Sequence, residues 1–168
     1  MPGPTDDYFT YKRWFDQHHD ALVLPADCSE PRPAPFEYTN QQTWTLRWFL
    51  VLSDERKVYI RIFEHFAKRS HLLMSQRIHF AYHFGPVVGV DAQGVPLHEP
   101  TDPVFVRIDN INMPPHLHPE GEQARHILQQ DIEGLVLEDL DLFDFVKASL
   151  RKRKNGTPMS RELGYRVA

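Results

Sequence analysis

Residues 43–66 have the sequence TWTLRWFLVLSDERKVYIRIFEHF, and this stretch decides the fold class. Within 43–53, alternate positions place two tryptophans and three leucines on one face of an extended chain. Residues 57–66 alternate in the same way, with Val58, Ile60 and Ile62 on one face. Because the short polar turn Ser53-Asp54-Glu55-Arg56 joins the two segments, the sequence predicts an antiparallel β-hairpin.

Further extended segments follow the hairpin. Residues 72–84 and 104–109 are predicted strands, and residues 124–130 form a less regular fifth one. Residues 85–103 contain three glycines and four prolines, a composition typical of a long loop. Neighbouring strands in the chain are therefore expected to pair in order, as an antiparallel meander.

Two helices are expected to flank this sheet. Aromatic residues at helical spacing predict a short helix in the first 20 residues, and the prolines of 25–37 predict a loop or extended connector after it. Residues 137–154 have apolar positions three and four apart, with acids in the first turns and bases in the last. They predict a C-terminal helix that ends at Asn155 and Gly156. The tail, 155–168, is either loose or packed on a partner.

Together these elements predict an α+β fold with an antiparallel β-meander sheet of about five strands and one helix from each end packed on it. We expect a single domain over 1–168. It comprises the N-terminal helix and proline-rich connector in 1–40, the sheet in 43–131, the helix in 137–154 and the tail.

Composition restricts the class of protein. Of 168 residues, 41% are hydrophobic and 25% charged, which is typical of a globular chain. The net charge of −4 provides no strong field toward nucleic acids or membranes. A single cysteine, Cys28, excludes an intrachain disulfide. With no signal peptide and no apolar run of about 20 residues, no membrane association is expected and the cytoplasm is the default compartment.

Chemistry is expected between residues 107 and 126. A strand would present Arg107 and Asp109 on the same face, and the prolines that follow would hold His116 and His118 in a stiff loop. His126 begins the next element. One interpretation is purely structural, with Asp109 or Asn110 capping a turn and the histidines solvated in the loop.

A second interpretation is a metal site. His116, His118 and Glu122 match half of the cupin metal pattern, and imidazole and carboxylate groups suit a divalent metal such as zinc. Asn110 and Gln129 stand where a cupin has glycines, and no histidine follows His126.

A third interpretation is acid–base catalysis on RNA without a metal or other cofactor. Two histidines can act as general base and general acid, and an arginine can hold a phosphate through two hydrogen bonds. Under this interpretation the candidate catalytic residues are Arg107, Asp109, His116, His118 and His126.

Residues 45–150 resemble the TumE family, small proteins encoded as the toxin component of two-gene toxin–antitoxin modules. Val51-Leu52-Ser53-Asp54 resembles the family's V-L-S-D-G turn, with Glu55 in place of glycine. The strand ending Ala81-Tyr82-His83-Phe84 resembles Y-x-Y-H, and Arg107-Ile108-Asp109-Asn110 resembles R-Y-D-N. His116-Leu117-His118 lies where the family has a histidine-rich stretch. Ile111-Asn112-Met113 separates that strand end from the prolines, and residues 1–40 and 85–103 are additional.

The resemblance implies a small helix-turn-helix antitoxin as partner, and a harmful activity such as RNA cleavage or another block to translation. Arg107 would grip an anion, Asp109 would orient a histidine, and one histidine would transfer a proton. A non-catalytic protein-interaction module, in which the aromatic face and proline-rich loops bind a partner, is the alternative from a different class. The sequence leaves homo-oligomerisation open.

Overall fold

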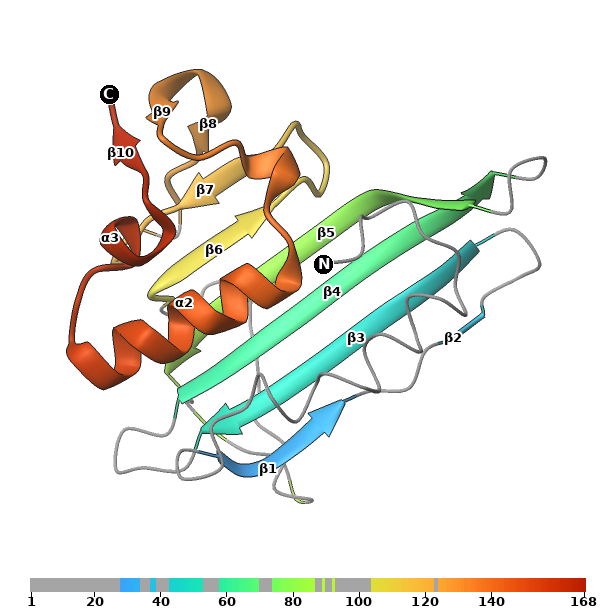
Figure 1. The fold of residues 1–168 in the computed structure, drawn as a ribbon, viewed down its shortest axis with the longest axis horizontal. Helices are drawn as coiled ribbons and strands as arrows, with labels where there is room; N and C mark the ends of the chain where they lie inside the picture. The colour runs from blue at the N-terminus through green and yellow to red at the C-terminus, as the bar shows by residue number, and fades with distance from the viewer. Residues whose placement is uncertain are drawn as a thin grey trace.

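The computed structural model describes residues 28–33, 37–38, 43–52, 58–69, 74–86, 89, 92, 104–122 and 124–168. The helix predicted near the N-terminus and most of the loop predicted for 85–103 lie outside these residues. Figure 1 shows a long twisted sheet with one long helix that lies over part of it, roughly along the direction of the strands.

The sheet confirms the predicted α+β class and is larger than the expected five strands. All its strand pairs are antiparallel, in the order β1-β3-β4-β5-β6-β7-β8, and β2 also pairs with β3. The strands are β1 (Cys28–Pro33), β2 (Glu37–Tyr38), β3 (Thr43–Leu52), β4 (Val58–Arg69), β5 (Met74–Pro86), β6 (Val106–Asp109), β7 (His116–His118) and β8 (Ile127–Leu128). From β3 onward the spatial order follows the chain, so the meander is confirmed.

Two segments expected to be connecting chain are strands. The proline-rich connector forms β1, which lies at one end of the strand order, and proline is tolerated in an edge strand because one row of amides there needs no partner. The stiff loop predicted for His116–His118 is β7. Leu117 is fully buried between the two histidines, so this segment gains the pairing and burial of a core strand.

The C-terminal helix begins later than predicted. Leu137–Asp139 form a short 3₁₀ turn, Leu140 is extended, and α2 spans Leu142–Asn155. The side chain of Asp141 accepts a hydrogen bond from the amide of Asp144 at 2.9 Å, so Asp141 is the N-cap. Gly156, in the left-handed conformation with φ 68°, ends α2 as predicted.

The segment expected as a tail has structure of its own. It contains α3 (Met159–Leu163) and β10 (Arg166–Val167), which pairs with β9 (Ile132–Glu133). Buried Met159 joins the core beside α2. These contacts draw the C-terminus back toward the β7–β8 end of the molecule, as Figure 1 shows.

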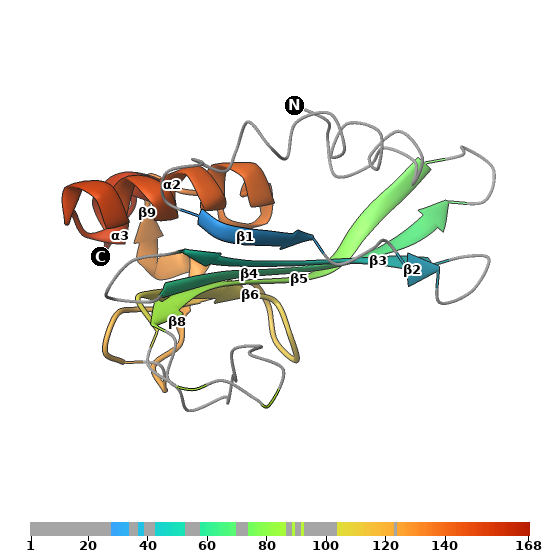
Figure 2. The ribbon, with the colours of Figure 1, turned by 90° about the horizontal axis from the view of Figure 1, so that it is seen from below.

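The two faces of the sheet have different surroundings. Figure 2 shows α2 and α3 on one side of β3–β6. That face contributes alternate residues of β4, β5 and β6 to the core, and the rings of Tyr82 and Phe145 lie 5.4 Å apart across the interface. The opposite face receives the intervening positions, including Arg61, Ala81 and Arg107.

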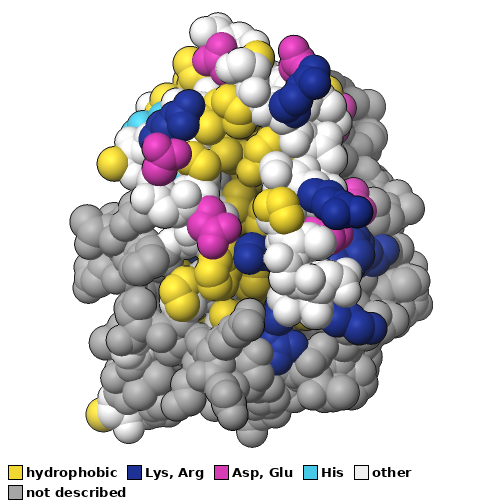
Figure 3. All heavy atoms as spheres, turned by 90° about the vertical axis from the view of Figure 1, so that its left-hand side faces the viewer, with side chains coloured by type: hydrophobic (Ala, Val, Ile, Leu, Met, Phe, Trp, Pro, Cys, Tyr) yellow, Lys and Arg dark blue, Asp and Glu magenta, His cyan; other side chains and the backbone are white. Residues whose placement is uncertain are grey.

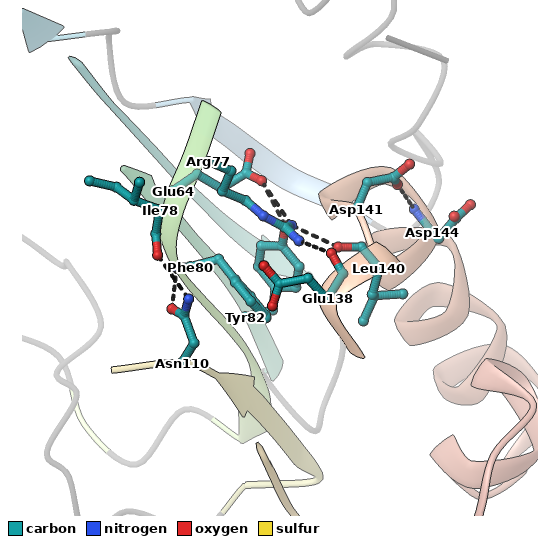
Figure 4. A network of polar contacts seen from close by, with 10 residues as sticks. All are labelled: Glu64, Arg77, Ile78, Phe80, Tyr82, Asn110, Glu138, Leu140, Asp141 and Asp144. Carbon is teal, nitrogen blue, oxygen red and sulfur yellow. Dashed lines mark hydrogen bonds and ion pairs between the residues drawn. The ribbon is translucent and has the colours of Figure 1, made fainter. Parts of the chain in front are cut away.

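A buried polar network fastens the chain before α2 to the sheet (Figure 4). The guanidinium of Arg77 donates to the backbone carbonyls of Leu140 at 2.7 Å and Glu138 at 2.5 Å. It also donates to the hydroxyl of Tyr82 at 2.5 Å, and that hydroxyl donates to Glu64 at 2.7 Å. All three side chains are at least 93% buried, since Arg77, the most exposed, has a relative exposure of 7%. The charges of Arg77 and Glu64 therefore compensate each other in a dry environment.

A bulge in β5 turns Arg77 into this interior. His79 pairs with His65 but Arg77 pairs with Phe66, so Ile78 is the extra residue. In a strand without a bulge, regular alternation from Phe80 back through Ile78 would direct Arg77 to the other face. Ile78 itself is 38% exposed.

One end of the molecule combines apolar and basic side chains. Figure 3 shows a band of hydrophobic side chains there, with lysines and arginines beside it. Lys152 on α2 lies 4.4 Å from the centroid of the Phe105 ring, a cation–π contact.

Among the described residues, no helix combines the length and the apolar character that crossing a membrane requires.

Replacing Arg77 with leucine should lower the free energy of unfolding by about 3–5 kcal/mol, because Glu64 would remain buried without the Arg77 guanidinium beside it. Urea unfolding of the variant measures this loss. Arg166→Leu, which removes an exposed ion pair with Glu133, should change stability little. Adding Glu64→Gln to Arg77→Leu should recover part of the loss; no recovery would contradict the role given to charge compensation.

Substitutions of Asp141 can separate the energetic cost of its buried charge from the stability that its N-cap hydrogen bond provides. Burial raises the pKa of its carboxyl, although the Asp144 amide opposes this. Asp141→Ala should cost about 1 kcal/mol through loss of the cap. Asp141→Asn keeps the acceptor without a desolvated charge, so it should be at least as stable as the wild type at neutral pH.

The sign of the pH dependence follows from the raised pKa of Asp141. The cost of its charge is present above that pKa and vanishes below the ordinary carboxyl pKa, where the wild type is also neutral. Any gain in the free energy of unfolding of Asp141→Asn over the wild type should therefore disappear as the pH falls. An advantage that grows under acid would contradict this account.

Candidate histidine and carboxylate site

Three adjacent strands bring the candidate residues together. Arg107 on β6 pairs with His118 on β7, and Asp109 pairs with His116. Directly paired residues lie on the same face of a sheet, whereas Ile108 and Leu117 between them face the core. The four polar side chains therefore form a two-by-two block on the face opposite α2.

Asp109 is the centre of this block and is fully buried. Its Oδ2 accepts a hydrogen bond from Arg107 Nε at 2.5 Å, and its Oδ1 accepts one from the Ile111 amide at 3.0 Å. Oδ1 lies 3.3 Å from His116 Nε2, and Oδ2 lies 3.5 Å from His118 Nε2. One carboxylate thus faces a guanidinium and two imidazoles.

The charge of Asp109 is set by these neighbours. Burial alone would raise its pKa, but His118, Arg107, the Ile111 amide and His116 together lower the pKa to about 2. Asp109 is therefore an anion throughout the neutral range.

His116 is held at both ring nitrogens. Its Nδ1 lies 2.9 Å from the carbonyl of Pro114, and its Nε2 faces Asp109. Burial is the largest influence and lowers the pKa of His116, with further lowering by His118 and His126; the Pro114 carbonyl and Asp109 oppose it. The ring is thus favoured in its neutral form.

His126 completes the group from the residue before β8. Its ring centroid lies 5.0 Å from that of His116 and 4.6 Å from that of His118, and those two lie 4.8 Å apart. One possible ligand atom from each ring falls within 4.8 Å of the others. His116 and His118 are buried, but His126 is exposed, so solvent reaches the group at His126.

Asn110 fixes the end of β6 next to this group. Its Oδ1 accepts a hydrogen bond from the Phe80 amide at 2.8 Å, and its Nδ2 donates to the carbonyl of Ile78 at 2.9 Å (Figure 4). The side chain therefore pairs with the backbone of β5 at its bulge. This contact allows the chain to leave the sheet directly after Asp109.

All five residues predicted as catalytic are brought together: Arg107, Asp109, His116, His118 and His126. Glu122, the carboxylate of the metal interpretation, is not among them. Its side chain forms an exposed ion pair with Arg125 at 3.2 Å, so the third member of the histidine group is His126.

The pairing of β5 with β4 and β6 determines the surroundings of this group. His83 pairs with both Arg61 and Arg107, so a row Arg61–His83–Arg107–His118 crosses four strands. A pocket of about 310 Å³ adjoins this row and is lined by Arg61, Ile62, Phe63, Ala81, His83 and Ile111. Alternation along each strand predicted which residues share a face, but only the register between strands could align them.

Comparison of the chain with protein-family models, with curated proteins and with solved structures finds no match. The resemblance to the TumE family therefore stays a prediction.

Asn110→Ala should destabilise the protein by about 1–3 kcal/mol, because it leaves the Phe80 amide and the Ile78 carbonyl without their partner. Asn110→Asp keeps the acceptor for the Phe80 amide, so it should lose less stability than the alanine variant. Urea unfolding measures both losses, and hydrogen exchange at the Phe80 amide should accelerate more in the alanine variant. Equal exchange in the wild type and the alanine variant would show that Asn110 does not hold the end of β6.

Proposed function

We propose that this chain is the effector of a TumE-like two-gene module and that it cleaves RNA at the histidine and carboxylate site. The observation that carries the proposal is the cross-strand row Arg61–His83–Arg107–His118. It leads from the exposed Arg61 to the histidine group on the face opposite α2. Arg61 lines the pocket and Arg107 is partly exposed, so these two arginines are the members of the row that phosphates can reach.

Arg107 is the group placed to hold the reacting phosphate. Its Nε is engaged by Asp109, and its side chain is 24% exposed, so its terminal nitrogens can donate to an anion. The Asp109 carboxylate prevents the guanidinium from rotating away. Such a fixed fork favours bidentate recognition of phosphate.

The proposed reaction is internal transesterification. The 2′-oxygen of the RNA attacks the adjacent phosphorus, and its proton passes to a base of the histidine site. The bond from phosphorus to the 5′-oxygen breaks, and that oxygen takes a proton from water. The products are a 2′,3′-cyclic phosphate and a 5′-hydroxyl, and the base returns its proton to solvent.

The first test is growth of a bacterial host in which the chain is induced, beside variants His126→Ala and Arg107→Ala. Both residues reach solvent, so these variants should retain the fold better than changes at buried His116 or His118. We expect the wild type to arrest growth and both variants to lose the arrest. Purified wild type should cleave RNA about 10²–10⁴-fold faster than His126→Ala.

His79→Ala is the matched control, because His79 is an exposed histidine on β5 whose ring stacks with His65, outside the site. It should arrest growth like the wild type. Arrest that survives in His126→Ala and Arg107→Ala would argue against this site and for the non-catalytic interaction module. Soluble wild-type protein without arrest or RNA cleavage would refute the effector role.

The proposal includes a partner, a small helix-turn-helix antitoxin. Co-expression of the gene adjacent to the one for this chain should abolish the arrest. The same co-expression should yield a complex that copurifies through a tag on either protein. If growth arrest persists in the presence of the adjacent gene product, that product is not the antitoxin.

A further inference from the structure

We infer that His116, His118 and His126, together with Asp109, form a binding site for a divalent transition-metal ion. The inference uses the same residues as the proposed function, but it does not require RNA to be the substrate. The converging ligand atoms come from His116 and His118 on β7 and from His126 before β8, and Asp109 on β6 lies beside the first two.

The arrangement of the three rings is the first observation. Their centroids form a nearly equilateral triangle with sides of 4.8, 5.0 and 4.6 Å, and their ligand atoms lie within 4.8 Å of one another. Ligands about 2.0–2.1 Å from a tetrahedral zinc ion are separated by roughly 3.4 Å. Small rotations of the side chains, chiefly of exposed His126, would close the triangle onto one ion.

The contacts of Asp109 match the same geometry. Its two carboxylate oxygens lie 3.3 and 3.5 Å from the Nε2 atoms of His116 and His118, close to the separation expected for ligands of one ion. Arg107 and the Ile111 amide hold the carboxylate in place from the other side. Asp109 thus lies where its negative charge would compensate that of an ion held by the histidines.

The orientation of His116 suits a metal ligand. Both of its nitrogens face oxygen acceptors, Pro114 O and Asp109 Oδ1. With its proton on Nδ1, the ring donates to Pro114 and presents the Nε2 lone pair to an ion beside Asp109. An N–H donated to a backbone carbonyl is also the usual outer contact of a metal-bound histidine.

The ligand set defines the class of ion. Imidazole nitrogens suit zinc, iron, cobalt and similar ions, whereas magnesium and calcium prefer sites made of oxygen atoms. The exposed side of the site, at His126, is where a water molecule could be an additional ligand. Such a water is acidified by the ion, and its hydroxide form would be the base required by the proposed cleavage.

Zinc binding to the intact chain, first stripped with a chelator, tests the inference. Isothermal titration should show one equivalent of Zn²⁺ and no comparable binding of Mg²⁺. Co²⁺ in place of Zn²⁺ should produce visible absorption bands typical of a low-coordinate nitrogen and oxygen site. Zn²⁺ should also raise the midpoint of thermal unfolding.

His126→Ala should weaken Zn²⁺ binding at least about tenfold, because it removes a ligand from the exposed rim. Asp109→Asn should weaken binding in the same direction, and the milder His126→Gln provides a second rim variant if alanine disturbs the fold. His79→Ala should bind Zn²⁺ like the wild type, since the His65–His79 pair lies outside the site. Absence of saturable binding to the wild type, or unchanged affinity in both His126 variants, would overturn the inference.

The two proposals fail in different ways. The wild type could bind one equivalent of zinc in a way that depends on His126 and yet not cleave RNA. That outcome would support the metal site and refute the proposed function. RNA cleavage that survives chelation in a protein without saturable zinc binding would support the function and overturn the metal site.

Discussion

The alternation of side chains along β6 and β7 is the constraint on which the rest of the structure depends. Ile108 and Leu117 are fully buried in the core beneath α2, and that burial fixes which positions face the other way. Arg107, Asp109, His116 and His118 occupy those positions. A slip of one residue in either strand would exchange apolar and ionisable side chains between the faces, so the core enforces the register of the site.

The bulge in β5, where the alternation is interrupted, connects the contacts on the two faces of the sheet. The bulge at Ile78 turns Arg77 inward, where it binds the chain before α2, and the same bulge exposes backbone groups that Asn110 binds from the end of β6. Asn110 is adjacent to Asp109. One irregularity in β5 therefore anchors the helical layer on one side and the carboxylate of the histidine group on the other.

The sequence contained much of this arrangement but not all of it. Period-two patterns predicted β3, β4, β5 and β6, because each has enough residues to show its alternation. Patterns in β1 and β7 were hidden by prolines, whose effect on the backbone depends on whether a strand lies at an edge. That His126 rather than Glu122 approaches His116 follows from how the turn after β7 closes, which local spacing does not determine. Likewise, no local signal marks Ile78 as a bulge.

The sheet tapers across its width, and this shape has a dynamic consequence. β4 and β5 have 12 and 13 residues, whereas β6, β7 and β8 have 4, 3 and 2. Short strands at one margin have few ladder bonds to hold them, so opening there should require much less free energy than unfolding of the central hairpin. The histidine group spans that margin. A ligand bound to the histidine group would hold β6, β7 and β8 together. Occupancy of the site would therefore be coupled to the order of these three strands.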